Sequence, residues 1–218
     1  MRFLCLHGLG TNSQIFETQT AAIRYDLGDK HIYDFVEGTI PCKMAPEFES
    51  VASATDRFFC YADFDDLPSC LAALDQLDTY VQEEGPFDGL MAFSQGATIA
   101  ATYLANKSRY NEPSPFKCAV LFSAGGVFDV ELLKKGVVSP LTAETAGEII
   151  RIPTAHIWGV NDSMVESGTV SAVCEAGKRE VYVHDGGHEI PAVRSPVQVK
   201  ACVRVLRRVI SIAASEEK

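Results

Sequence analysis

Short apolar stretches that end at small or polar turn residues restrict the fold of this chain more than any other feature. The first, residues 3–6, does not alternate apolar with polar side chains, which is typical of a strand buried on both faces of a sheet. Similar stretches recur at residues 31–36, 88–93, 119–122, 154–158 and 180–183. Longer segments of helical pattern separate them, so the sequence predicts an α/β fold with a mostly parallel central sheet flanked by helices.

Three segments carry clear helical signals. The strongest is residues 68–84, where apolar side chains recur at helical spacing and Gly85–Pro86 ends the pattern. Residues 95–106 and 197–213 are predicted to form two further helices.

The chain has 218 residues and a hydrophobic fraction of 47%, which suits one compact unit with a sizeable core. We therefore expect a single domain over residues 1–218. Residues 38–65 hold scattered aromatics and little periodicity. We expect them to form an excursion over the C-terminal edge of the sheet, where ligands bind in open α/β sheets, and not a large separate lid domain.

The formal net charge is −10. Such a chain repels nucleic-acid phosphates and anionic membrane surfaces, so neither is expected as a partner. Lys134–Lys135 and residues 204–208 are the local basic exceptions. The seven cysteines are odd in number and include no Cys-x-x-Cys pair, which is typical of reduced thiols in a cytoplasmic protein. No signal peptide or membrane span is recognisable.

The stretch Ala92-Phe93-Ser94-Gln95-Gly96 marks a candidate nucleophile. An apolar strand runs into Ser94 and small helix-forming residues follow, which is the context of a nucleophile elbow. Residues two before and two after such a serine must be small for strand and helix to pass. Gly96 meets this need, whereas Ala92 stands where the motif usually has glycine.

A serine hydroxyl needs a neighbouring base and an orienting acid before it can act as a nucleophile. In this class of fold the chain order is Ser, then Asp or Glu, then His. His188 follows the predicted strand at 180–183, and Asp162 follows the one at 154–158. The sequence thus predicts a catalytic triad of Ser94, Asp162 and His188.

Other interpretations of these residues remain open at this point. Asp129, after the strand at 119–122, is an alternative acid. His184 and His188 lie four apart and could bind a metal on a helix, but two glycines between them disfavour a helix. We expect His184 to have a structural role and Asp185 to be a turn residue. Neither a metal nor a cofactor is expected.

Hydrolysis also requires donors for the negative charge that develops on the carbonyl oxygen. Each backbone N–H aimed at that oxygen can contribute roughly 3–4 kcal/mol. One donor is expected to be the N–H of Gln95, directly after the nucleophile. The other is expected in the loop His7-Gly8-Leu9-Gly10, at Leu9, with His7 packing beneath the site.

Taken together, these segments resemble the FSH family of serine hydrolases, which are minimal α/β-hydrolases. The resemblance is carried by residues 4–19, 85–101, 156–162 and 184–191, and it is weakest at 38–65 and 129–151. It implies the α/β-hydrolase fold and an esterase or thioesterase activity on acyl substrates, with Ser94, Asp162 and His188 as the triad. Some fungal members look like accessory hydrolases of secondary, polyketide metabolism.

Three other functions fit the same pattern. The triad could transfer an acyl group to an alcohol or amine, or cleave a carbon–carbon bond beside a ketone. A ligand-binding homologue without turnover is the third. The substrate is expected to be a small-molecule acyl ester or thioester. If the acyl group arrives on an acyl carrier protein, which is usually acidic, a basic face such as Lys134–Lys135 is needed to receive it.

Overall fold

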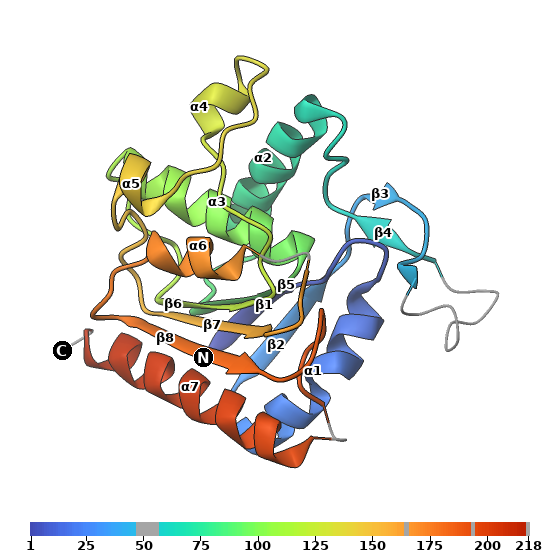
Figure 1. Cartoon of the computed structure of the whole chain (residues 1–218), viewed down its shortest axis with the longest axis vertical. Coiled ribbons are helices and arrows are strands. Elements are labelled where there is room, and N and C mark those ends of the chain that lie inside the picture. The colour runs from blue at the N-terminus through green and yellow to red at the C-terminus, as the bar shows by residue number, and fades with distance from the viewer. Residues whose placement is uncertain (47–56, 164–165, 193–194, 217–218) are drawn as a thin grey trace.

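A six-stranded sheet, parallel throughout, forms the centre of the computed structural model, which describes residues 1–46, 57–163, 166–192 and 195–216. The strand order is β2-β1-β5-β6-β7-β8 (Figure 1). These strands are β1 (Arg2–Leu6), β2 (Ile32–Val36), β5 (Gly89–Phe93), β6 (Cys118–Phe122), β7 (Thr154–Gly159) and β8 (Arg179–His184). The prediction of a mostly parallel sheet is confirmed, and each predicted strand is present with ends that differ by at most one residue.

Both faces of the sheet are buried. Successive side chains of a strand point to opposite faces. Leu4 and Leu6 accordingly pack into one apolar cluster, and Phe3 and Cys5 pack into a second cluster on the other face. This double burial explains why the strands appear in the sequence as continuous apolar runs.

Helices cover the two faces (Figure 1). On one side lie α1 (Ser13–Leu27) and α7 (Pro196–Ser215); on the other lie α2 (Leu67–Glu84), α3 (Gln95–Arg109), α6 (Ser167–Ala172) and the short helices α4 (Val130–Leu133) and α5 (Ala143–Ala146). The predicted helices at 68–84, 95–106 and 197–213 correspond to α2, α3 and α7. No separate lid domain is evident in the described residues.

Helix α1 was not among the predicted helices. Its buried residues are Phe16, Thr20 and Ile23, so a threonine interrupts its apolar stripe. The clearer signal is its start, where the Asn12 side chain accepts a hydrogen bond from the Ile15 N–H at 2.8 Å.

A second, two-stranded antiparallel sheet lies beside the C-terminal edge of the large one. Its strands are β3 (Ile40–Pro41) and β4 (Phe59–Cys60). The Phe59 N–H donates to the Thr11 carbonyl at 2.8 Å, and the Gly10 N–H donates to the Phe59 carbonyl at 3.1 Å. These bonds join the predicted excursion to the loop after β1. Residues 47–56 of that excursion lie outside the described residues.

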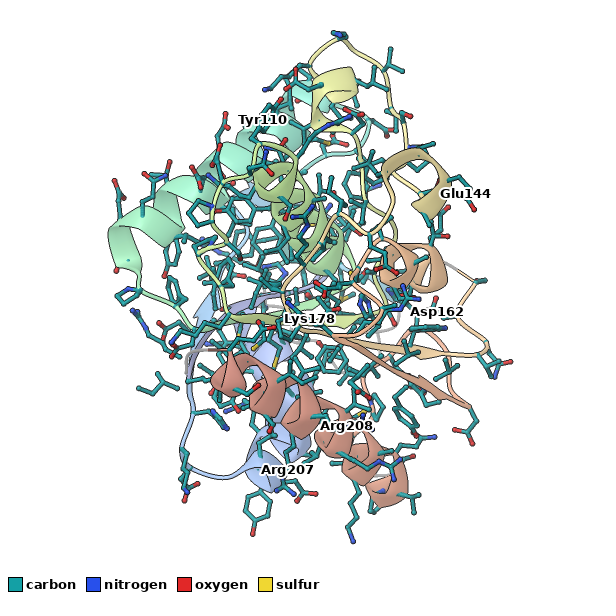
Figure 2. All side chains as sticks on the ribbon, turned by 90° about the vertical axis from the view of Figure 1, so that its left-hand side faces the viewer. Tyr110, Glu144, Asp162, Lys178, Arg207 and Arg208 are labelled. Carbon is teal, nitrogen blue, oxygen red and sulfur yellow. The ribbon has the colours of Figure 1, made fainter. Side chains whose placement is uncertain are left out.

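Arg207 and Arg208 of α7 lie on the side of the sheet away from Tyr110 and Glu144 (Figure 2). Arg208 pairs with Glu180 at 2.9 Å, and Arg207 donates to the carbonyl of Asp26 at 2.6 Å. Among the described helices, none has the length and apolar character needed to cross a membrane.

Candidate active site

The C-terminal ends of the parallel strands bring the predicted site residues together. Loops at this edge of an open α/β sheet are the usual place for a ligand site. Leu9 follows β1, Ser94 follows β5, Asp162 follows β7 and His188 follows β8.

Ser94 lies in a strained turn between β5 and α3. Its φ of 52° and ψ of −116° fall in a region that residues with a Cβ rarely adopt. Its N–H donates to the Phe122 carbonyl of the neighbouring strand at 2.9 Å, which fixes the turn. A Cβ on Gly96 would lie 2.6 Å from the His7 carbonyl oxygen, so only glycine fits there. Ala92 is fully buried in β5, so its methyl group is accommodated.

His188 contacts both other predicted triad members. Its Nε2 lies 2.9 Å from Ser94 Oγ, and its Nδ1 lies 2.8 Å from Asp162 Oδ2. The Asp162 side chain is fully buried, whereas that of His188 is 23% exposed and faces the groove. The Phe93 ring packs beside the imidazole, with 5.1 Å between ring centroids. With Nδ1 protonated toward Asp162, Nε2 is free to accept the serine proton.

The loop that carries His188 is bonded to the loop that carries Asp162. The Asn161 N–H donates to the Gly186 carbonyl at 3.1 Å, and Asn161 Nδ2 donates to the Asp185 carbonyl at 2.8 Å. A side chain on Gly159 would collide with the carbonyls of Gly186 and Gly187. Sequence reasoning did not identify Asn161 and Gly159, because their role depends on the close approach of two loops.

The alternative acid is engaged elsewhere. Asp129 caps α4 by accepting from the N–H groups of Glu131 and Leu132 at 2.9 and 3.1 Å. Its other oxygen lies 2.7 Å from Arg109 Nη1. Asp162, and not Asp129, therefore contacts His188 in this structure.

The neighbouring residues His184 and Asp185 make structural contacts. Nδ1 of His184 accepts from the Gly186 N–H at 3.2 Å, and burial lowers the pKa of this histidine. The Asp185 carboxylate accepts a hydrogen bond from the Gln198 side chain of α7. Both contacts hold the turn that precedes His188.

The two residues predicted to supply the oxyanion donors line the same groove as Ser94. Leu9 and Gln95 both line that groove, together with Ser94 and His188. Gly8 lies so close that a Cβ on it would be 3.3 Å from the Ser94 Cβ. The N–H groups of Leu9 and Gln95 donate none of the hydrogen bonds found among the described residues. Their role as an oxyanion hole stays a prediction.

His7 supports the loop that carries Leu9. Its Nε2 accepts from the Gly38 N–H at 2.9 Å, and its Nδ1 lies 2.8 Å from the Gly8 carbonyl, to which it donates in this tautomer. Burial lowers the pKa of His7, which favours the neutral ring. Glu37 Oε1 lies 3.0 Å from Nε2 of His7 and also accepts from the Ser13 N–H.

The side chain of Gln95 was not anticipated from the sequence, which assigned a role only to its backbone. Its Nε2 donates to the Ala62 carbonyl at 2.7 Å, and its Oε1 accepts from the Tyr61 N–H at 2.8 Å. The Tyr61 hydroxyl in turn accepts from the His7 N–H and donates to the Val36 carbonyl. The nucleophile turn, the loop after β1 and the groove wall are thus one connected network.

Comparison with known proteins agrees with this geometry. A family model described as "Serine hydrolase (FSH1)" matches residues 1–199. "Esterase FPY3" of Fusarium mangiferae is 40% identical over 98% of this chain and 98% of its own length. "Hydrolase phiM" of a fungal species (strain ATCC 74256) is 31% identical, over 87% of this chain and 86% of its own length.

Solved structures show the same fold at low sequence identity. SOBER1 of Arabidopsis thaliana superimposes with a TM-score of 0.63 at 15% identity, covering 96% of this chain and 99% of that one. A carboxylesterase from Mesorhizobium loti gives a TM-score of 0.62 at 16% identity, covering 94% and 88%. The predicted α/β-hydrolase fold is thereby confirmed. With its family match and its fungal relatives, this chain belongs to the FSH1 family of serine hydrolases.

Proposed function

We propose that this protein hydrolyses carboxylic esters or thioesters through an acyl-enzyme formed on Ser94. The observation that carries the proposal is the continuous contact from Ser94 Oγ to His188 Nε2 and from His188 Nδ1 to Asp162 Oδ2. The residues act as one catalytic unit at the edge of the sheet. The family assignment and the esterase names of the relatives support the same reaction class.

In the first half-reaction, Ser94 Oγ attacks the carbonyl carbon while its proton passes to His188 Nε2. The carbonyl oxygen becomes an oxyanion and accepts from the N–H groups of Leu9 and Gln95. When the tetrahedral intermediate collapses, the bond to the leaving group breaks. The proton on Nε2 then transfers to the departing alkoxide or thiolate.

In the second half-reaction, a water molecule enters the groove and gives a proton to His188 Nε2 as its oxygen attacks the acyl carbon. The bond to Ser94 Oγ then breaks, and the serine takes the proton back. Asp162 stays ionised throughout, holds the imidazole in one tautomer and stabilises its charged form. The buried position of this carboxylate strengthens that interaction.

We also propose that the acyl groups come from fungal secondary metabolism, in which the enzyme trims or releases a polyketide chain. The fungal origin of the curated relatives and the resemblance to accessory hydrolases support this assignment. Delivery by an acyl carrier protein would require a basic face. Lys135, beside Lys134 at the end of α4, is the candidate contact.

A fluorophosphonate probe tests the nucleophile, because it labels activated serines covalently. We expect labelling of the wild-type protein and none of Ser94→Ala. Labelling that survives this substitution would refute the assignment. A labelled protein that binds acyl esters but releases no product from them would indicate a binding homologue without turnover.

A further inference from the structure

A second, apolar cavity adjoins the groove. It lies between α2, α3 and the segment around α4, which Figure 1 shows gathered on one side of the sheet. Its volume is about 170 Å³, and its walls include Leu67, Leu74, Ile99, Leu133 and Val138. We call this cavity the side pocket.

The side pocket and the groove share a wall. Ala62 and Phe64 line both. The Ala62 carbonyl accepts a hydrogen bond from the side chain of Gln95, the residue that follows Ser94. The Ala62 side chain is buried. Phe64 is 50% exposed and stands where the two spaces meet. Thr98 also lines the side pocket and lies four residues beyond Ser94 along α3, a rise of about 6 Å. The side pocket therefore lies next to the groove that holds Ser94.

The chemistry of the walls selects a hydrocarbon. Among the described residues that line the pocket, none carries a charge. The two threonine hydroxyls are bonded to main-chain groups: Thr98 Oγ1 accepts from the Gly125 N–H at 2.9 Å, and Thr102 Oγ1 from the Phe128 N–H at 3.2 Å. A polar ligand would lose its hydration there without compensation. An engineered apolar cavity of about 150 Å³ binds benzene, so this pocket suits a group of about six carbon atoms.

The location of the side pocket relative to His188 indicates which half of the ester, acyl chain or leaving group, it binds. The leaving group must take its proton from His188 Nε2. His188 and Glu189 line the groove, and neither lines the side pocket. The side pocket instead includes Ala62, whose carbonyl accepts from the side chain of Gln95, the residue expected to supply an oxyanion donor. We infer that the side pocket binds the acyl chain of the substrate, as a hydrocarbon of about six carbons, while the leaving group lies in the open groove. This inference rests on the proposed function of Ser94.

Two esters with the alkyl chain on opposite sides of the carbonyl test the inference: methyl hexanoate and hexyl acetate, with methyl acetate as the reference. Val138→Trp places an indole at the pocket. Val137→Trp is the matched control, since Val137 and Val138 are 49% and 56% exposed neighbours and only Val138 lines the pocket. We expect V138W to lower kcat/KM for methyl hexanoate by about tenfold, the loss of roughly two buried methylene groups. Turnover of hexyl acetate and methyl acetate should stay unchanged, and V137W should leave all three unchanged.

An equal effect of V138W and V137W on methyl hexanoate, or a loss confined to hexyl acetate, would overturn the inference while leaving Ser94 as the nucleophile. Leu67→Ala provides a second variant, which enlarges the pocket and should move the preferred acyl chain toward octanoate. Equilibrium binding of methyl hexanoate to Ser94→Ala, with and without V138W, does not depend on turnover. Weaker binding in the double variant supports the pocket even if no ester is hydrolysed, and equal binding contradicts it.

Discussion

The side-chain amide of Gln95 donates to the carbonyl of Ala62 at 2.7 Å, and so fastens the wall of the groove to the residue after the nucleophile. The same side chain accepts from the Tyr61 N–H. Gln95 therefore has two roles in the proposed chemistry, one for its backbone and one for its side chain. In the proposed mechanism its backbone N–H donates to the oxyanion. Its side chain holds Ala62, which lines both the groove and the side pocket.

Gln95→Leu keeps the size of this side chain and removes both hydrogen bonds. The Tyr61 N–H and the Ala62 carbonyl lose their partners, at a cost of about 1–3 kcal/mol each if they stay buried. We expect a lower melting temperature and a loss of about tenfold in kcat/KM for hexanoyl esters, equivalent to roughly 1.4 kcal/mol. Gln82→Leu, at an exposed glutamine of α2 bonded to Asp78, is the control. If Q95L has the stability and kinetics of the wild-type protein, the two hydrogen bonds of the Gln95 side chain do not shape the site.

Asp162→Asn tests the orienting acid. The amide preserves the shape of the side chain but can stabilise the wrong imidazole tautomer, which lowers kcat by about 10⁴-fold in serine-protease triads. We expect a loss of that order. Asp129→Asn should leave turnover of short esters nearly unchanged, because Asp129 caps α4 and pairs with Arg109. Steady-state kinetics of the two variants decide between the acids: the reverse ranking would transfer the role to Asp129.

Substitutions at Gly96 and Ala92, on the two sides of Ser94, are expected to have opposite outcomes. Gly96→Ala places a methyl group against the carbonyls of Leu6 and His7, which are main-chain atoms that cannot easily move. We expect it to reduce stability by about 1–3 kcal/mol and to remove most activity. Ala92→Gly restores the usual residue of the motif and should retain activity within a few fold. Chemical denaturation and esterase assays of both variants would show the pattern, and an active, fully stable G96A would contradict it.

His156 makes stability depend on pH. Burial, with a smaller effect of the Arg179 charge, lowers the pKa of this histidine to about 3. An unfolded histidine titrates near 6.5, so between about pH 6.5 and about pH 3 the unfolded chain binds a proton that the folded chain lacks. The stabilisation from neutral His156 is complete above about pH 6.5 and falls by about 1.4 kcal/mol per unit as the pH decreases through this range.

Urea unfolding of wild type and His156→Gln at about pH 7.5 and about pH 5.5 measures this effect. The wild-type protein should lose about 1.4 kcal/mol more than the variant over that interval. Equal losses in the two proteins would show that His156 is not the group responsible.

If an acyl carrier protein delivers the substrate, the turnover rate should depend on surface charge, whereas turnover of a free substrate should not. Lys134 is paired with Glu131 at 2.9 Å, whereas Lys135 forms no ion pair within the described residues. Reversal of both to glutamate should slow turnover of an acyl chain on an acidic carrier protein and leave a free thioester unaffected. Competition between the two substrates in one assay would reveal the difference. Equal rates on the carrier-bound substrate would remove Lys134 and Lys135 as its docking contacts.

The strands and the candidate catalytic residues could be predicted from the sequence because each leaves a local signal. Burial of both sheet faces made residues such as 3–6 and 119–122 continuously apolar. Chain order and strand-end position were enough to select Ser94, Asp162 and His188 as candidates. Their contact distances depend on how three loops fold back over one edge, which no local pattern encodes.

The features that were missed depend on tertiary contacts. Helix α1 buries Thr20 between Phe16 and Ile23, because the hydroxyl can bond the Phe16 carbonyl at 2.9 Å within the helix. The hydrogen bond from Gln95 to Ala62 joins residues 33 apart in the chain, and the one from Asn161 to Asp185 joins residues 24 apart. The side pocket likewise combines α2, α3 and the α4 segment, each of which looks like ordinary core in sequence.

Peptide mapping by mass spectrometry, after a rapid acid quench of the enzyme with a hexanoyl ester, tests the central claim most directly. The account predicts a hexanoyl group on the peptide that contains Ser94, absent from Ser94→Ala and longer-lived in His188→Ala if that variant still acylates. Hexanoyl on a different residue, or unchanged turnover in Ser94→Ala without any acylated peptide, would contradict it.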